Sequence, residues 1–126
     1  MVRFLSIREY SYFLLTFFFD LVYNALMDFL IIYLAIINII ALAAMGIDKK
    51  KAEKKEWRIP ENRLFLYVIL GGGIGGTLGM FLFRHKTKHA KFRIFFPFIT
   101  IVEYSALIFV LIRYHDSLTY FLPIFN

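Results

Sequence analysis

The apolar residues of this chain gather into three long runs. Residues 29–47 contain nineteen positions without a charge, residues 64–83 contain twenty, and residues 94–112 are interrupted only by Glu103. A helix needs about 20 apolar residues to cross the hydrocarbon core of a bilayer. Within lipid a backbone must satisfy its own hydrogen bonds, which favours helices. The pattern therefore predicts about three membrane-spanning helices.

The segments outside these runs are less regular. Residues 10–19 form an apolar stretch that is too short to span a bilayer. The acids Asp20 and Asp28 lie between this stretch and the apolar run 29–47. We interpret residues 1–27 as an N-terminal extension that forms either an interfacial helix or a poor additional span. Met27, just before the first good run, is an alternative start of the protein. The predicted organisation is thus an extension (1–27), a membrane domain (28–113) and a C-terminal tail (114–126).

Composition supports the membrane class. The chain has 126 residues, of which 60% are hydrophobic and 20% aromatic, against about 45–50% apolar residues in ordinary soluble domains. A soluble domain of this size leaves too much of its surface exposed to hide so many apolar side chains. We therefore predict an all-α integral membrane protein. The chain has no cysteine, which excludes a disulfide framework and a thiolate metal site.

The positive charge is concentrated in one part of the chain. Twelve of the fifteen Lys and Arg residues lie within 49–93, and residues 48–93 contain only four acids. Such a concentration beside apolar runs indicates contact with anionic lipid headgroups or with another polyanion at the membrane surface. Together with the apolar runs, it predicts a multi-pass protein of the bacterial inner membrane.

The basic residues form two loops, 48–63 and 84–93, and these create a topological conflict. Basic loops tend to stay in the cytoplasm, yet a single crossing by residues 64–83 would place one of them outside. The five glycines within 71–76 offer one solution, a break that makes a re-entrant hairpin. The alternative is a continuous helix whose small residues let a neighbouring helix approach closely, including one from a second copy. The residues of that helix-packing face are Gly72, Gly75, Gly76 and Gly79.

The second basic loop suggests a phosphate site. Arginine offers a planar fork for bidentate contact, and lysine and hydroxyl groups add further donors. His85 and His89 have the i, i+4 spacing of two metal ligands on a helix, but the lysines around them and the absence of a nearby acid in sequence disfavour a metal. We therefore predict no metal and no cofactor. The predicted anion-binding residues are Arg58, Arg84, His85, Lys86, Thr87 and Lys88.

Two polar residues are predicted to lie in the membrane interior. Glu103 is the lone acid of the third run, and a charge at mid-bilayer costs upwards of about 2.5 kcal/mol. It should be neutral or paired, with Asn38 of the first run as a hydrogen-bonding partner. Interhelical bonding is the favoured role, and a proton or ion pathway is the alternative. No arrangement of nucleophile, base and acid is evident, so we expect no enzyme.

The motifs around the loops carry a family resemblance. The segments "GIDKKKA", "WRIPENRLFL" and "FRHKTKHAKFR" resemble the bacterial membrane family catalogued as domain of unknown function 1294, over about residues 27–112. Some members carry a cold-shock nucleic-acid-binding domain, which is not recognisable in this sequence. The positions that match the motifs of that family are Asp48, Lys49, Ala52, Trp57, Arg58, Pro60, Glu61, Arg84, His85, Lys86, Thr87 and Phe92.

Three functions are compatible with this pattern. The leading hypothesis is a non-catalytic membrane protein whose cytoplasmic basic loops contact anionic lipid or phosphate groups. A nucleic-acid-associated protein ranks lower, because only Trp57 and Phe92 offer rings for base stacking in these loops. An oligomeric small-solute or ion transporter, assembled through the glycine face with Glu103 on its path, is the third.

Overall fold

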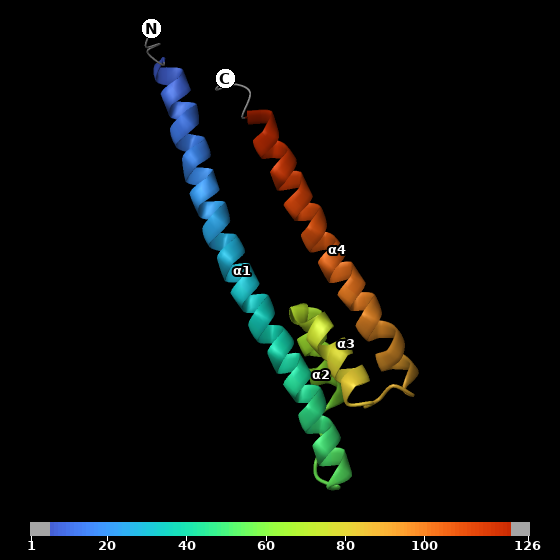
Figure 1. The fold of residues 1–126 in the computed structure, drawn as a ribbon. Coiled ribbons are helices and arrows are strands. Elements are labelled where there is room, and N and C mark those ends of the chain that lie inside the picture. Colours follow the sequence, from blue (N-terminus) through green and yellow to red (C-terminus); the bar gives the residue numbers. More distant parts are fainter. Residues whose placement is uncertain (1–5, 122–126) are drawn as a thin grey trace. The chain divides into compact units, whose positions relative to one another are not determined.

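The computed structural model describes residues 6–121, and their side chains up to residue 116, and this part of the chain contains helices and no strand (Figure 1). Three helical segments are long and apolar enough to cross a membrane, namely Ile7–Glu53, Glu61–Leu82 and Ala90–Asp116. The elements in chain order are α1 (Ile7–Glu53), α2 (Glu61–Tyr67), the π-helix η1 (Val68–Gly72), α3 (Gly73–Leu82) and α4 (Ala90–Phe121).

The chain divides into two compact units, residues 1–35 and 36–126. The described part of the first unit is the N-terminal stretch of α1, which begins with a capping box. Ser6 N–H donates to Glu9 Oε2 at 2.8 Å, and Glu9 N–H donates to Ser6 Oγ at 3.4 Å. The predicted N-terminal extension is thus helical from Ile7, and it continues into the first apolar run without a break.

The second unit contains a sharp reversal in the middle apolar run. Gly71 has φ 117° and ψ −1°, a left-handed conformation that breaks the helix between α2 and α3. A continuous helix over Glu61–Leu82 would separate its ends by about 30 Å. Instead Lys86 Nζ, just beyond α3, lies 3.9 Å from Glu61 Oε1 at the start of α2. Of the two predicted alternatives, the structure shows the helical hairpin (Figure 1).

The turn of the hairpin is held by α1. Asn38 Nδ2 donates to the carbonyl oxygen of Gly71 at 3.1 Å, and Asn38 Oδ1 accepts from Gly75 N–H at 2.7 Å. Nδ2 also donates to Tyr104 Oη of α4 at 3.0 Å. One side chain therefore satisfies backbone groups that the break frees, which is the condition for tolerating a broken helix away from water. The predicted bond between Asn38 and Glu103 is not formed, since neither Glu103 oxygen has a hydrogen-bond partner among the described residues.

The predicted glycine face is used inside the chain. A Cβ at Gly75 would overlap the carbonyl oxygen of Asn38, so α1 and α3 approach at backbone distance there. Gly72 and Gly79 also face α1, whereas Gly76 faces Val68 and Phe96. The glycines thus pack α3 against its own neighbours, as close-packed small residues do in membrane helices. A homo-oligomer through the same face stays a prediction.

The core lies between the hairpin, α4 and the part of α1 that belongs to the second unit. Its buried members are Ala44, Met45, Leu64, Val68, Met80, Phe92 and Phe96. Much of the remaining apolar surface faces outward, and almost none of the most apolar stretch of α4 is buried. A soluble monomer rarely exposes a contiguous apolar surface of this extent. This outward surface suits contact with lipid.

The hairpin predicts that both basic loops are accessible from one side of the membrane. The chain lacks cysteine, so Lys54→Cys and Lys88→Cys each create a unique thiol in an exposed loop position. We expect a membrane-impermeant maleimide to label both variants from the same side of the membrane. Labelling of the two variants from opposite sides would contradict the hairpin.

Candidate functional site

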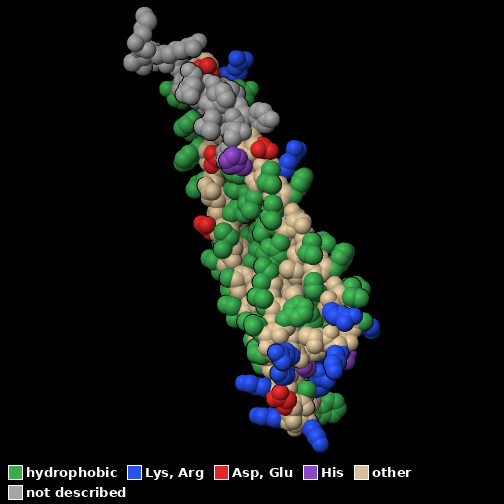
Figure 2. Space-filling view, turned by 45° about the vertical axis from the view of Figure 1, so that its right-hand side comes forward, with side chains coloured by type: hydrophobic (Ala, Val, Ile, Leu, Met, Phe, Trp, Pro, Cys, Tyr) green, Lys and Arg blue, Asp and Glu red, His purple; other side chains and the backbone are tan. Residues whose placement is uncertain are grey.

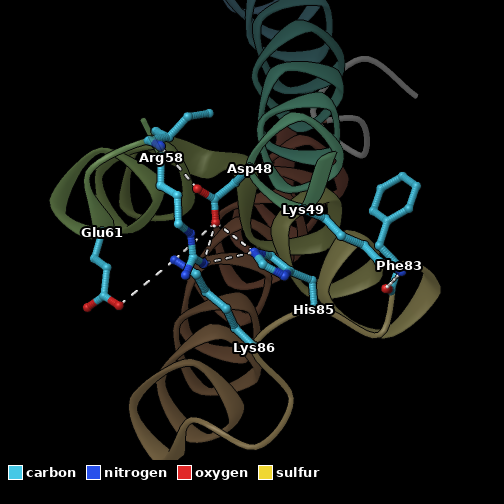
Figure 3. Close-up of polar contacts among 8 residues, drawn as sticks. Asp48, Lys49, Arg58, Glu61, Phe83, His85 and Lys86 are labelled. Carbon is cyan, nitrogen blue, oxygen red and sulfur yellow. Dashed lines mark hydrogen bonds and ion pairs between the residues drawn. The ribbon is translucent and has the colours of Figure 1, made fainter. Parts of the chain in front are cut away.

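The two basic loops converge on a buried acid, Asp48, near the C-terminal end of α1 (Figure 3). Its side chain is fully buried. One oxygen, Oδ1, accepts from the N–H of Ile59 at 3.0 Å. The other, Oδ2, lies 3.1 Å from Arg58 Nη2, 2.6 Å from His85 Nε2 and 3.2 Å from Lys86 Nζ. Both loops therefore depend on one carboxylate.

The contacts fix the hydrogen on the His85 ring. A carboxylate oxygen only accepts, so Nε2 must carry a hydrogen to bond Asp48 Oδ2 at 2.6 Å. The Nη2 atom of Arg58, 3.3 Å from the same Nε2, is also a donor, and two donors cannot bond each other. The two nitrogens lie close together because both bond Asp48 Oδ2. His85 and Arg58 are thus ordered side by side by Asp48.

Two matching helix ends bring the loops into place. At the end of α1, Glu56 N–H bonds the carbonyl of Lys51 and Lys55 N–H bonds that of Ala52, with Lys55 at φ 54°. This is the Schellman pattern, in which a left-handed residue closes the helix. It turns the chain back toward the buried end of α1, so that Arg58 and Ile59 reach Asp48.

The end of α3 has the same pattern. His85 N–H bonds the carbonyl of Met80 and Arg84 N–H bonds that of Phe81, with Arg84 at φ 47°. The residue after the left-handed position is His85, and the motif directs its ring toward α1. Lys86, also left-handed at φ 58°, completes the turn toward Asp48.

Two lysines strengthen the junction. Lys49 Nζ donates to the carbonyl oxygen of Phe83, which joins α1 directly to the end of α3 (Figure 3). Lys86 Nζ lies 4.5 Å from the ring centroid of the buried Phe92, a cation–π distance. Its second acid, Glu61, is 3.9 Å away with a half-exposed side chain, so this contact is weak. Lys86 is held chiefly by Asp48.

The structure separates the predicted anion-binding residues into two groups. Arg58, His85 and Lys86 contact Asp48, whereas Arg84 and Lys88 are exposed and Thr87 is half-buried. The histidine pair does not lie on a helix, since residues 83–89 form the loop between α3 and α4. The spacing of His85 and His89 therefore does not align their rings on one helical face.

Sequence reasoning missed Asp48 as the centre of the site. It judged the second loop to have no acid nearby, because Asp48 precedes His85 by 37 positions. One signal in the sequence was the position of Asp48, which directly follows the apolar run 29–47 and precedes three lysines. An acid at the end of an apolar run suggests a buried carboxylate that pairs with bases. Its position within the family motif "DKKKA" was a second signal.

The remaining charge of this end faces outward. Residues 48–93 hold twelve Lys and Arg against four acids, a formal excess of eight positive charges. Figure 2 shows blue side chains gathered over the loop end of the second unit, bordered by green apolar side chains. This excess remains after Asp48 has been counted among the four acids. The arrangement is an inner cluster of ion pairs on Asp48 beneath a positively charged surface.

Removal of the central carboxylate should destabilise the protein strongly. Asp48→Asn leaves the buried Lys86 without its main counter-charge, and breaking a buried pair in this way costs about 3–5 kcal/mol. We expect the free energy of unfolding, measured in lipid nanodiscs, to fall by about that amount. Glu61→Gln is the matched control, with an effect below about 1 kcal/mol because the pair is exposed and long. Similar losses in both variants would contradict a central role for Asp48.

Comparisons with known proteins agree with the resemblance in sequence. The family described as "Protein of unknown function (DUF1294)" matches residues 38–92, a range that includes Asn38, Asp48, Lys86 and Phe92. The chain is 49% identical over 71 residues to "Uncharacterized protein YsdA" of Bacillus subtilis (strain 168), covering 56% of this chain and 80% of that protein. No solved structure matches the chain. The chain therefore belongs to the DUF1294 family of proteins of unknown function.

Proposed function

We propose that this chain is a multi-pass protein of the bacterial inner membrane whose basic end binds the phosphate groups of anionic lipids on the cytoplasmic side. The observation that carries the proposal is the convergence of both basic loops at one end, through the contacts of Arg58 and His85 with Asp48. This convergence removes the topological conflict. The helices α1 and α4 can each cross the membrane while both basic loops stay on its cytoplasmic side.

The exposed cations carry the binding in this proposal. Each basic side chain near an anionic surface contributes about 1 kcal/mol of attraction. Arg84 and Lys88 are exposed, and Arg58 uses one terminal nitrogen on Asp48 while its side chain stays 45% exposed. The remaining donors of Arg58 are therefore available for a phosphate. The buried Lys86 holds the fold instead.

The backbone at Arg84 supports a role for its charge. A left-handed residue at the end of a helix is usually glycine, because other L-residues pay roughly 1–2 kcal/mol in this conformation. Arginine occupies the position with φ 47°, although glycine would relieve the strain. Strain kept at a particular side chain favours a functional role for that side chain.

Nucleic acid is the second candidate, and one observation favours it. Trp57 is 95% exposed at the tip of the first basic loop, where a base could stack on it. Phe92, the other ring considered for stacking, is buried at 1% exposure. One ring gives a small stacking surface, and charge would supply most of the affinity. Lipid therefore remains the favoured partner.

Lipid binding predicts that the purified chain retains anionic lipid selectively. We expect native mass spectrometry from mixed micelles to show phosphatidylglycerol bound in preference to phosphatidylcholine. The variant Arg84→Gly with Lys88→Gln should lose most of this preference, since two contacts of about 1 kcal/mol each amount to roughly 30-fold. The glycine relieves the left-handed strain, so lost binding in this variant would not arise from misfolding.

Arg113→Gln is the control for loss of a positive charge away from the two basic loops. Arg113 is an exposed base on α4, twenty residues from the α4 end of the second loop. We expect this variant to keep the lipid preference. Equal retention of neutral and anionic lipid by the wild-type chain would refute the proposal. Salt-sensitive RNA binding that depends on Trp57 and outcompetes anionic lipid would favour the second candidate.

A further inference from the structure

Glu103 of α4 is a half-buried acid that has no contact with the described residues of the basic end. Both of its carboxylate oxygens are inaccessible and have no hydrogen-bond partner among the described residues. Buried polar groups are nearly always satisfied, and an orphaned one points to a missing ligand such as an ion, a proton or a water. The position lies within the apolar span Ala90–Asp116, where an unpaired acid is a functional-site signal.

The carboxylate lies against the break in the hairpin. A Cβ at Gly73, the first residue of α3, would be 2.9 Å from Glu103 Oε2 and 2.5 Å from Thr100 Oγ1. The backbone N–H groups of Gly71 and Gly73 lie close to the carboxylate, although neither oxygen makes a well-formed hydrogen bond among the described residues. Because Gly73 has no side chain, Glu103 Oε2 and Thr100 Oγ1 can both lie close to the turn.

The neighbouring hydroxyl is oriented to present a lone pair. Thr100 Oγ1 donates its hydrogen to the carbonyl of Phe96 at 2.7 Å. Thr77 Oγ1 lies 3.1 Å from Thr100 Oγ1 and must be the donor in that pair, because the Thr100 hydrogen is already used. One lone pair of Thr100 Oγ1 remains unused by these bonds. Thr100 Oγ1 lies beside the same point of the turn as Glu103 Oε2, and it is a third oxygen that could contact a ligand there.

No basic residue close in sequence balances a negative charge on the Glu103 carboxylate. On α4 the nearest bases in sequence are Arg93 and Arg113, ten positions away on either side, or about 15 Å along the helix. Residues 36–47 and 64–82, which pack around the turn, contain no Asp, Glu, His, Lys or Arg, and Tyr104 and Tyr67 are the titratable groups nearby. A helix N-terminus offers only about half a positive charge.

We propose that Glu103 and Thr100 form a binding site for one monovalent cation, a proton or an alkali ion, at the turn of the hairpin. A single carboxylate is neutralised by one positive charge, whereas a divalent ion would leave an excess in an apolar setting. Hard cations take oxygen ligands, and broken helices line ion sites in membrane proteins. The N-terminus of α3 favours the anionic form of Glu103, so the ligands of the cation are the oxygens of Glu103 and Thr100. The site is separate from the basic end and does not depend on phosphate binding there.

The test uses the full chain in nanodiscs of neutral lipid, which removes any contribution from anionic headgroups. The melting midpoint is measured in N-methylglucamine buffer, with added Na⁺ or K⁺, and across a pH series without alkali ions. Infrared difference spectra record the carboxylate bands in parallel. An alkali ion should raise the midpoint in proportion to the logarithm of its concentration. A proton should raise it as the pH falls, with a protonated carboxyl band.

The variants separate these sources and make the proposal refutable. Glu103→Gln should lose the alkali-ion response in both measurements, and it should lose the rise of the midpoint at falling pH together with the protonated carboxyl band. Thr100→Val should weaken an alkali-ion response at least tenfold in apparent affinity and leave a proton response. Glu53→Gln, at an exposed position at the end of α1, should respond like the wild type. The proposal is overturned if wild type and Glu103→Gln respond alike, or if the wild type responds to neither ion nor pH.

Discussion

The left-handed backbone at Gly71 is the constraint on which the arrangement of the second unit depends. With φ at 117°, a residue carrying a Cβ would be strained there, whereas glycine adopts this conformation readily. The reversal converts one apolar run, long enough to cross a membrane, into two half-helices, α2 and α3. The start of α2 and the end of α3 therefore lie near each other. The family's two basic motifs, which flank this run, become neighbours as a consequence.

Polar side chains hold the hairpin at both of its ends. At the turn, Asn38 bonds Gly71 and Gly75, which compensates for hydrogen bonds that the break removes. At the open end, Asp48 binds groups from both loops. Both residues lie on α1, ten positions apart, so this helix acts as the support for the hairpin. Between them the glycines of α3 allow backbone contact with α1, and aromatic rings of α2 and α4 complete the core.

The predictable part of this fold is the part that depends on local pattern. The three apolar runs follow from their length, and the glycine cluster correctly marks the region of the break. Local pattern could not choose between a hairpin and a close-packed helix, because both require glycine. The contacts of Asp48 with His85 and of Asn38 with Gly71 could not be predicted from local pattern either, since each joins residues more than thirty positions apart. For this reason the sequence pattern predicted Glu103 as the partner of Asn38, which instead bonds Gly71, Gly75 and Tyr104. It also predicted one anion-binding group that combined the bases in contact with Asp48 and the exposed Arg84 and Lys88.

The hairpin itself is tested most directly by a distance between the two arms. Nitroxide labels at Asn62→Cys and Leu82→Cys, both exposed positions, report the separation of the first turn of α2 from the last turn of α3 in the full chain in lipid. The hairpin predicts strong dipolar broadening, because both sites lie at the loop end of the unit. A continuous helix would place them about 30 Å apart. A narrow distribution at that distance would contradict the account.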